Sequence, residues 1–138
     1  MLWATRRGCH VDRTACIWLI RRRIDPDAEF SFFVDASEAP EGAELFDVAG
    51  ARLSHRGDAC SFETMLEEYD LDDTVLREIS EIVHDADLMD DMYGRSEADG
   101  LDAVIRGMQL ALPDDNVLSV HTDIIFDGLY AYLWRETL

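Results

Sequence analysis

The sequence predicts an α+β fold: a small N-terminal β-sheet with a packed helix, followed by a mainly α-helical second half of about four helices. Strand-like apolar runs occur only in the first half, whereas capping residues followed by amphipathic segments dominate the second. No linker, repeat or low-complexity tract interrupts the 138 residues. We therefore expect one domain over residues 1–138, long enough to bury a core without disulfides.

The first half predicts a helix between two strands. Leu2 to Arg6 alternates loosely and is typical of a short strand. Asp12 is expected to cap a helix that runs to about Ile24, with Asp25-Pro26 ending it. The segment 29–34 is the clearest strand, and 45–48 and 51–54 are short candidate strands for a hairpin around Gly50. The expected buried side of the helix is Ala15, Trp18, Leu19 and Ile20.

The second half predicts four helices with recognisable caps. The expected spans are 62–69 after Ser61, a helix to about 87 after Asp72 or Asp73, 97–112 after Ser96, and a last helix reaching 135 from Asp114 or Asp115. Pro113 ends the third of these helices. The expected apolar side of the last helix is Ile124, Ile125, Leu129, Tyr130 and Leu133.

The charge is far from average for a globular chain. Asp plus Glu number 30 against 12 basic residues, lysine is absent, and the net charge is −18. Such a field repels phosphates, so we expect no direct binding to nucleic acid or to an anionic membrane. A lysine-free acidic surface resembles proteins of salt-loving organisms, and it predicts that folding requires high salt.

Cysteine usage and the N-terminus favour a cytoplasmic protein. Cys9, Cys16 and Cys60 are odd in number and include no CxxC pair, which argues against a disulfide framework. The N-terminus lacks an apolar segment long enough for a signal peptide, and no apolar run could cross a membrane.

The stretch from His55 to Asp87 predicts a divalent-metal site on a pair of helices. His84 and Asp87 are three residues apart, hence neighbours on one edge of the helix, and Glu81 precedes them by the same interval. If the preceding helix packs antiparallel, His55 and Glu63 approach the same end. The predicted ligands of Zn, Fe or Mn are His55, Glu63, His84 and Asp87, with Asp85 and Glu97 as other candidates.

A second interpretation of the same residues involves no metal. Carboxylates are abundant throughout this chain, so one near a histidine is expected by chance, and most of them would be solvated surface groups. A single histidine at a helix edge is also commonly a hydrogen-bonded structural group. Cys60, at a helix start near His55, suggests a nucleophile pair, but no oxyanion-hole motif accompanies it.

Arginines gather at the start of the first helix. Arg6, Arg7 and Arg13 near a helix N-terminus could hold a small oxyanion. The alternative is that Arg6 and Arg7 simply pair with surface carboxylates, and a capping Asp12 would compete with a bound anion.

Five blocks in order resemble the C-terminal domain of the ChrB chromate resistance family. They are WATRRGCHVDRTACIWLIRRRIDPDAEF, LFDVAGARLSHRGDACSFETML, EIVHDADL, SEADGLDAVIRGM and IIFDGLYA. The resemblance covers nearly the whole chain and implies an association with chromate resistance. It strengthens the four predicted ligands, which fall inside the shared blocks, and adds Asp12 and Arg13 as candidates. A DNA-binding role of the part that precedes this domain in full-length members is not implied here.

Three functions remain open from the sequence. The first is a metal-binding module that senses or responds to chromate or metal stress, with an oxyanion such as chromate at the arginines. The second is a metalloenzyme, hydrolytic or redox, whose metal keeps an open coordination position. The third is a metal-free regulatory domain that binds a partner protein.

The aromatic segment YAYLW near the C-terminus suggests either a homodimer contact or packing that closes the core of the domain.

Overall fold

The computed structural model describes residues 1–138 and confirms the α+β fold. A parallel sheet of order β2-β1-β3 is built from β1 (Leu2–Arg6), β2 (Glu29–Phe33) and β3 (Glu44–Leu45). Helix α1 (Val11–Leu19) continues into a π-helical turn, Ile20–Ile24, and connects β1 to β2. A short 3-10 turn, Ala36–Glu38, precedes β3. The helix between two strands was predicted for the first half, and the structure adds that these strands pair in parallel.

Four helices form the second half, with bounds close to those predicted. They are α2 (Ser61–Glu68), α3 (Thr74–Leu88), α4 (Glu97–Ala111) and α5 (Asp115–Glu136). Asp73 accepts hydrogen bonds from the amides of Val75 and Leu76, and Asp114 from that of Asn116, so two predicted caps are confirmed. Helix α2 starts one residue earlier than expected, after Cys60.

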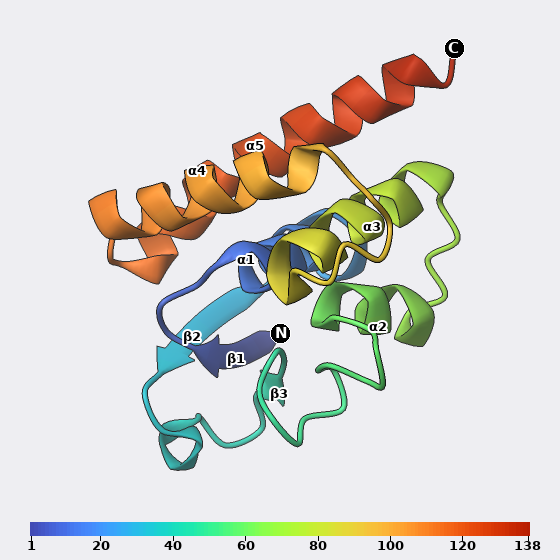
Figure 1. Cartoon of the computed structure of the whole chain (residues 1–138). Coiled ribbons are helices and arrows are strands. Elements are labelled where there is room, and N and C mark those ends of the chain that lie inside the picture. The colour runs from blue at the N-terminus through green and yellow to red at the C-terminus, as the bar shows by residue number, and fades with distance from the viewer.

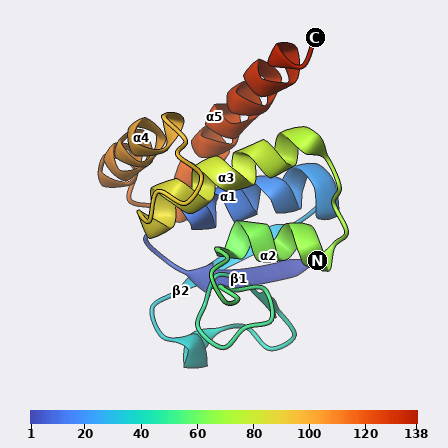
Figure 2. The ribbon, with the colours of Figure 1, turned by 45° about the vertical axis from the view of Figure 1, so that its right-hand side comes forward.

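Helix α1 lies at the centre of the arrangement. It contacts α2, α3, α4 and α5. In Figures 1 and 2 the strands lie on one side of α1, α2 and α3 lie next to it, and α4 and α5 form the outer layer opposite the sheet. This position explains why almost every residue of α1 is buried, including Ala15, Trp18 and Leu19.

The expected hairpin after β2 is wrong. Leu45 belongs to β3, which pairs in parallel with β1, while Phe46 and Leu53 share only an isolated bridge. The two side chains are fully buried, and Phe46 stacks edge-on against Trp3 at a centroid distance of 6.4 Å. Burial of both aromatic and aliphatic groups draws this segment inward as a loop, so a two-stranded ribbon does not form.

The start of α1 also differs from the prediction. His10 is the N-cap, and Asp12 lies inside the first turn, 2% exposed. Its carboxylate does not cap α1 but accepts hydrogen bonds from α2. Asp12 therefore connects α1 to α2 instead of capping α1.

Three consecutive arginines attach the end of α1 to distant helices. Arg21 contacts Asp123 at 2.8 Å, Arg22 contacts Asp127 at 2.9 Å, and Arg23 contacts Asp73 at 3.2 Å. The indole of Trp18 also donates to Asp127. These contacts fix α5 along α1.

The apolar side of α5 was predicted only in part. Leu133 is buried and Leu129 and Tyr130 are half-buried, but Ile124 is 63% exposed. Leu118 and Phe126 are buried instead, because the stripe that faces α1 runs through them. Tyr132 and Trp134 are exposed, so a homodimer contact there stays a prediction.

None of the helices combines the length and the apolar character that crossing a membrane requires.

Candidate functional site

Residues from four segments meet at the ends of α1, α2 and α3. The Nε2 atom of His55 lies 3.2 Å from Oδ2 of Asp12, 3.3 Å from Oδ2 of Asp87 and 3.8 Å from Oδ1 of Asp47. Asp12 comes from the first turn of α1 and Asp87 from the last turn of α3. We call Asp12, His55 and Asp87 the first donor group, since their ligand atoms all lie within 4.8 Å of one another.

Asp12 is held by the N-terminus of α2. Its two oxygens accept hydrogen bonds of 2.9 Å from the amides of Ser61 and Phe62. These amides have no partner inside their own helix, and the positive end of the helix dipole favours a carboxylate there. The buried Asp12 side chain is thus pinned in one orientation, facing His55.

Asp47 is the third carboxylate near His55, and its own contacts are with Arg13 and Ser61. Arg13 Nε lies 2.9 Å from its Oδ2, and Ser61 Oγ donates to its Oδ1 at 2.6 Å. Its backbone has a φ of 51°, an uncommon conformation that aspartate tolerates better than most residues. Arg13 further donates to the carbonyls of Arg6 and Asp47.

The proximity of these acids changes their protonation. Burial, and then the charge of Asp12, raises the pKa of Asp47 to about 7 and that of Asp87 to about 6. The hydrogen bond to Asp12 raises the pKa of His55 to about 9. In the metal-free chain the group therefore retains protons at pH values where isolated carboxylates have lost theirs.

A small cavity of about 150 Å³ opens beside this group. Its lining has no hydrophobic residue and consists of Gly8, His10, Asp12, Arg13, Asp47 and Asp87. His10 makes no side-chain hydrogen bond, although its carbonyl accepts from the amide and hydroxyl of Thr14. Burial and the neighbouring Arg106 lower the pKa of His10.

A second donor group lies between α2 and α3 and consists of Cys60, Glu63 and His84. Both ring nitrogens of His84 contact carboxylates, Nδ1 with Glu63 and Nε2 with Asp90 at 2.9 Å. Glu63 also accepts from the Cys60 amide at 2.9 Å. Burial opposes the charged form of His84, but the hydrogen bonds of the two carboxylates outweigh it and raise its pKa. Burial, reinforced by Asp12, raises the pKa of the Cys60 thiol.

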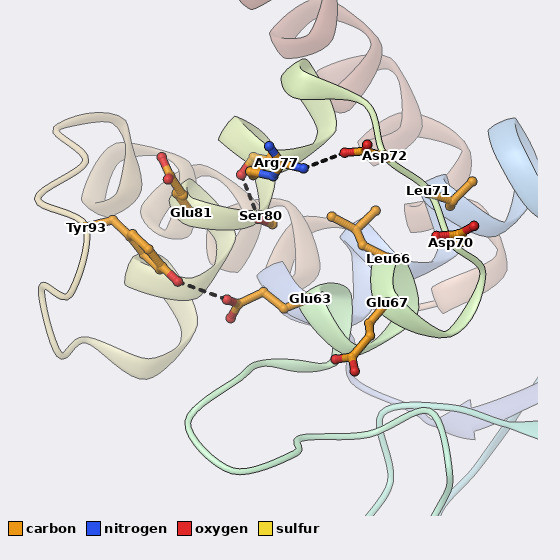
Figure 3. Close-up of a pocket in the computed structure, with 10 residues that line it drawn as sticks. All are labelled: Glu63, Leu66, Glu67, Asp70, Leu71, Asp72, Arg77, Ser80, Glu81 and Tyr93. Carbon is orange, nitrogen blue, oxygen red and sulfur yellow. Dashed lines mark hydrogen bonds and ion pairs between the residues drawn. The ribbon is translucent and has the colours of Figure 1, made fainter.

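A larger cavity of about 450 Å³ borders the second group (Figure 3). Tyr93 points into it and donates to Glu63 at 3.2 Å. Arg77, the one basic residue of the lining, is paired with Asp72. The cavity is therefore acidic and holds no free cationic side chain for an anion.

The four predicted ligands thus fall into two pairs. His55 lies with Asp87 in the first donor group, and Glu63 lies with His84 in the second. The two groups are neighbours, since Asp12 and Glu63 contact the same first turn of α2 and His84 and Asp87 are one turn apart on α3.

Of the other candidates, Asp85 belongs to a third possible donor group with His84 and Asp90, whose ligand atoms all lie within 4.8 Å of one another. Asp85 accepts hydrogen bonds from the amides of Tyr93 and Arg95, which orders the loop after α3. Glu97 pairs with Arg95 at 3.1 Å. Arg6 and Arg7 form no ion pair, and Arg7 lines a shallow cavity with acidic residues of the α5 N-terminus. Arg13 is paired with Asp47, and an anion site at the three arginines stays a prediction.

Sequence reasoning did not single out Asp47, and it did not place His10 or Asp90 at a metal site, although all three lie beside the donor groups. Asp47 and Asp90 lie in loops among many acids, where no periodic signal distinguishes them. His10 directly precedes α1 and lies two residues before Asp12. This spacing was the sequence signal that could have placed His10 near Asp12.

Comparison with known proteins gives a consistent assignment. The model of the family described as "ChrB, C-terminal domain" matches residues 3–133. Protein ChrB of Cupriavidus metallidurans is 40% identical over 131 residues, which is 94% of this chain and 40% of that protein. The chain thus spans about two-fifths of the length of this relative. No solved structure matches it. By the extent of the family match and the identity to its relative, the chain belongs to the ChrB C-terminal domain family.

Proposed function

We propose that this chain is a divalent-metal-binding domain that takes part in the response to chromate or other metal stress. The metal is held by Asp12, His55 and Asp87. The link to chromate rests on the family, and the metal site rests on the geometry of the first donor group.

The observation that carries the proposal is the spacing around His55 Nε2. Two carboxylate oxygens lie 3.2 and 3.3 Å from this nitrogen, and they come from different helices. Ligand atoms bonded to one tetrahedral metal ion at about 2.1 Å are roughly 3.4 Å apart. A metal ion therefore fits between these three residues with small side-chain movements.

The local charge also matches a divalent cation. Asp12, Asp47 and Asp87 stand against one arginine, Arg13, which leaves two negative charges without a partner when His55 is neutral. A metal ion would also replace the protons that the raised pKa values of Asp47 and Asp87 retain. One imidazole with two carboxylates suits Zn, Fe or Mn.

In this proposal Glu63 and His84 support the site instead of ligating the metal. Glu63 and Asp90 contact different ring nitrogens of His84, so they do not converge on one nitrogen as Asp12 and Asp87 do at His55. The Cys60 thiol also resists the deprotonation that a ligand requires. Glu63 caps α2, whose first amides hold Asp12. The pair therefore orders the turn that positions a metal ligand.

Elemental analysis of natively purified protein, followed by titration with Zn²⁺, Mn²⁺ and Fe²⁺, tests the proposal. We expect one equivalent of metal, and about 100-fold weaker binding, or about 2.7 kcal/mol, after His55→Ala or Asp87→Asn. The matched controls are His121→Ala and Asp27→Asn, because both residues are exposed and belong to none of the donor groups. Metal content that is far below one equivalent, or unchanged in the His55 and Asp87 variants, would falsify the assignment.

A further inference from the structure

We infer that the proposed metal centre keeps one coordination position open toward the 150 Å³ cavity, where it binds a water molecule that small monovalent anions can replace. His10 is the positioning residue for this ligand. The inference rests on the proposed metal centre and assigns the class of ligand that the centre takes from solvent.

The first step is the number of protein ligands. Asp12, His55 and Asp87 supply one donor atom each. Asp47 is the nearest further carboxylate, but its Oδ1 lies 3.8 Å from His55 Nε2, and Asp47 is not among the residues whose ligand atoms all lie within 4.8 Å of one another. Three protein ligands are fewer than the four or more that Zn, Fe or Mn require, so the coordination must be completed from outside the chain.

The second step is the position of the cavity. Asp12 and Asp87 line it, whereas His55 lines a different cavity of about 430 Å³ with the loop after β3. A ligand in the small cavity thus approaches the metal from the side of the two carboxylates. The cavity has room for a few water molecules, and its wholly polar lining favours their presence.

The third step is His10, a half-buried residue that lines the same cavity and whose imidazole has no hydrogen-bond partner in the chain. The start of α1 fixes its backbone, because its carbonyl accepts from Thr14 N at 3.0 Å. A half-buried imidazole without a partner is hydrogen-bonded to solvent or to a ligand. Because His10 lines the same cavity as Asp12 and Asp87, a molecule bound to the metal there is the partner that we infer for it.

Charge decides which ligands are accepted. A divalent ion would neutralise the two negative charges that remain after Arg13 pairs with Asp47. A neutral centre accepts water or a monoanion readily, whereas a tetrahedral dianion would bring two new negative charges among three carboxylates. We therefore expect the open position to prefer azide over sulfate.

Loading the full chain with Co²⁺ tests the inference, because the visible ligand-field bands of cobalt change when a metal-bound ligand is exchanged. Azide should alter these bands saturably, and sulfate at equal ionic strength should not. His10→Ala should weaken azide binding by about tenfold without releasing Co²⁺, and His10→Gln should recover part of it. His121→Ala is the control and should behave as the parent chain does.

The outcomes separate this inference from the proposed function. Bound Co²⁺ whose bands ignore azide would show a closed centre and overturn the open position alone. An azide response that His10→Ala leaves unchanged would overturn the role of His10. Failure of Co²⁺ to bind at all would overturn the metal centre and this inference together.

Discussion

Asp12 and His55 lie 43 residues apart in the sequence, yet Oδ2 of the one and Nε2 of the other are 3.2 Å apart. The same Asp12 oxygen accepts the amide of Ser61 at 2.9 Å. One buried carboxylate thus joins α1 to the start of α2 and also faces the imidazole of the proposed metal site. Asp12 thus has two roles, a structural contact and a proposed metal ligand. Comparison with Asp87, which has only the second role, separates the effect of a substitution on folding from its effect on metal binding.

That comparison is the first prediction. Asp12→Asn should weaken metal binding and also destabilise the metal-free protein by about 1–3 kcal/mol, because the amide of Asn cannot match both α2 amides. Asp87→Asn should weaken metal binding equally but leave the metal-free protein as stable or more stable. Burial and Asp12 already disfavour the charged form of Asp87, so its neutral replacement relieves repulsion. Urea unfolding in the presence of EDTA measures the stability of both metal-free variants. Equal losses of stability in the two variants would contradict the different roles assigned to Asp12 and Asp87.

The pH dependence of stability should differ between the metal-free and metal-loaded forms. The folded-state pKa values of Asp87, about 6, and Asp47, about 7, lie above the ordinary carboxyl value, so their ionisation removes stability as the pH rises. The raised pKa of His55, about 9, acts in the same direction, since stability from its charged form is lost as the pH rises through that value.

We therefore expect the Tm of the metal-free protein to fall between pH of about 5 and about 9. Metal competes with protons for the same groups, so the gain in Tm on adding metal should grow over this range. Differential scanning calorimetry at constant ionic strength checks both trends. A metal-free Tm that rises with pH would refute the expectation, and Asp27→Asn should follow the parent curve.

His84→Gln should separate the two donor groups. Gln can keep only one of the two carboxylate contacts, so we expect a loss of about 1–3 kcal/mol in unfolding free energy. Metal stoichiometry at the first donor group should stay at one, because His84 is not among its ligands. The matched control is His121→Gln on the exposed side of α5. Loss of the metal in folded His84→Gln protein would move the site to Cys60, Glu63 and His84.

Local signals allowed much of the fold to be predicted. Asp73 and Asp114 precede amphipathic segments, and each caps the helix expected of it. Long-range packing decided the rest: β3 pairs in parallel with β1, and Asp12 binds the N-terminus of α2. His55 and Asp87 were predictable as candidates from residue type and helix spacing. Asp12 was a weaker candidate, and Asp47 was not a candidate at all. Only tertiary contacts distinguish these two carboxylates from the other acidic residues among the 30 of the chain.

The acidic surface predicts that stability depends on salt. Lysine is absent, and all arginines except Arg6, Arg7 and Arg135 already form ion pairs. The net charge of −18 already counts these arginines, so it is an excess of carboxylates that they do not offset. The Debye length falls from about 10 Å at 0.1 M salt to about 3 Å at 1 M, which removes repulsion between carboxylates at longer range. The Tm should therefore rise from low to molar KCl, and by more than in sucrose of equal osmolality. A melt that is flat across this range would show that the acidic surface does not limit folding.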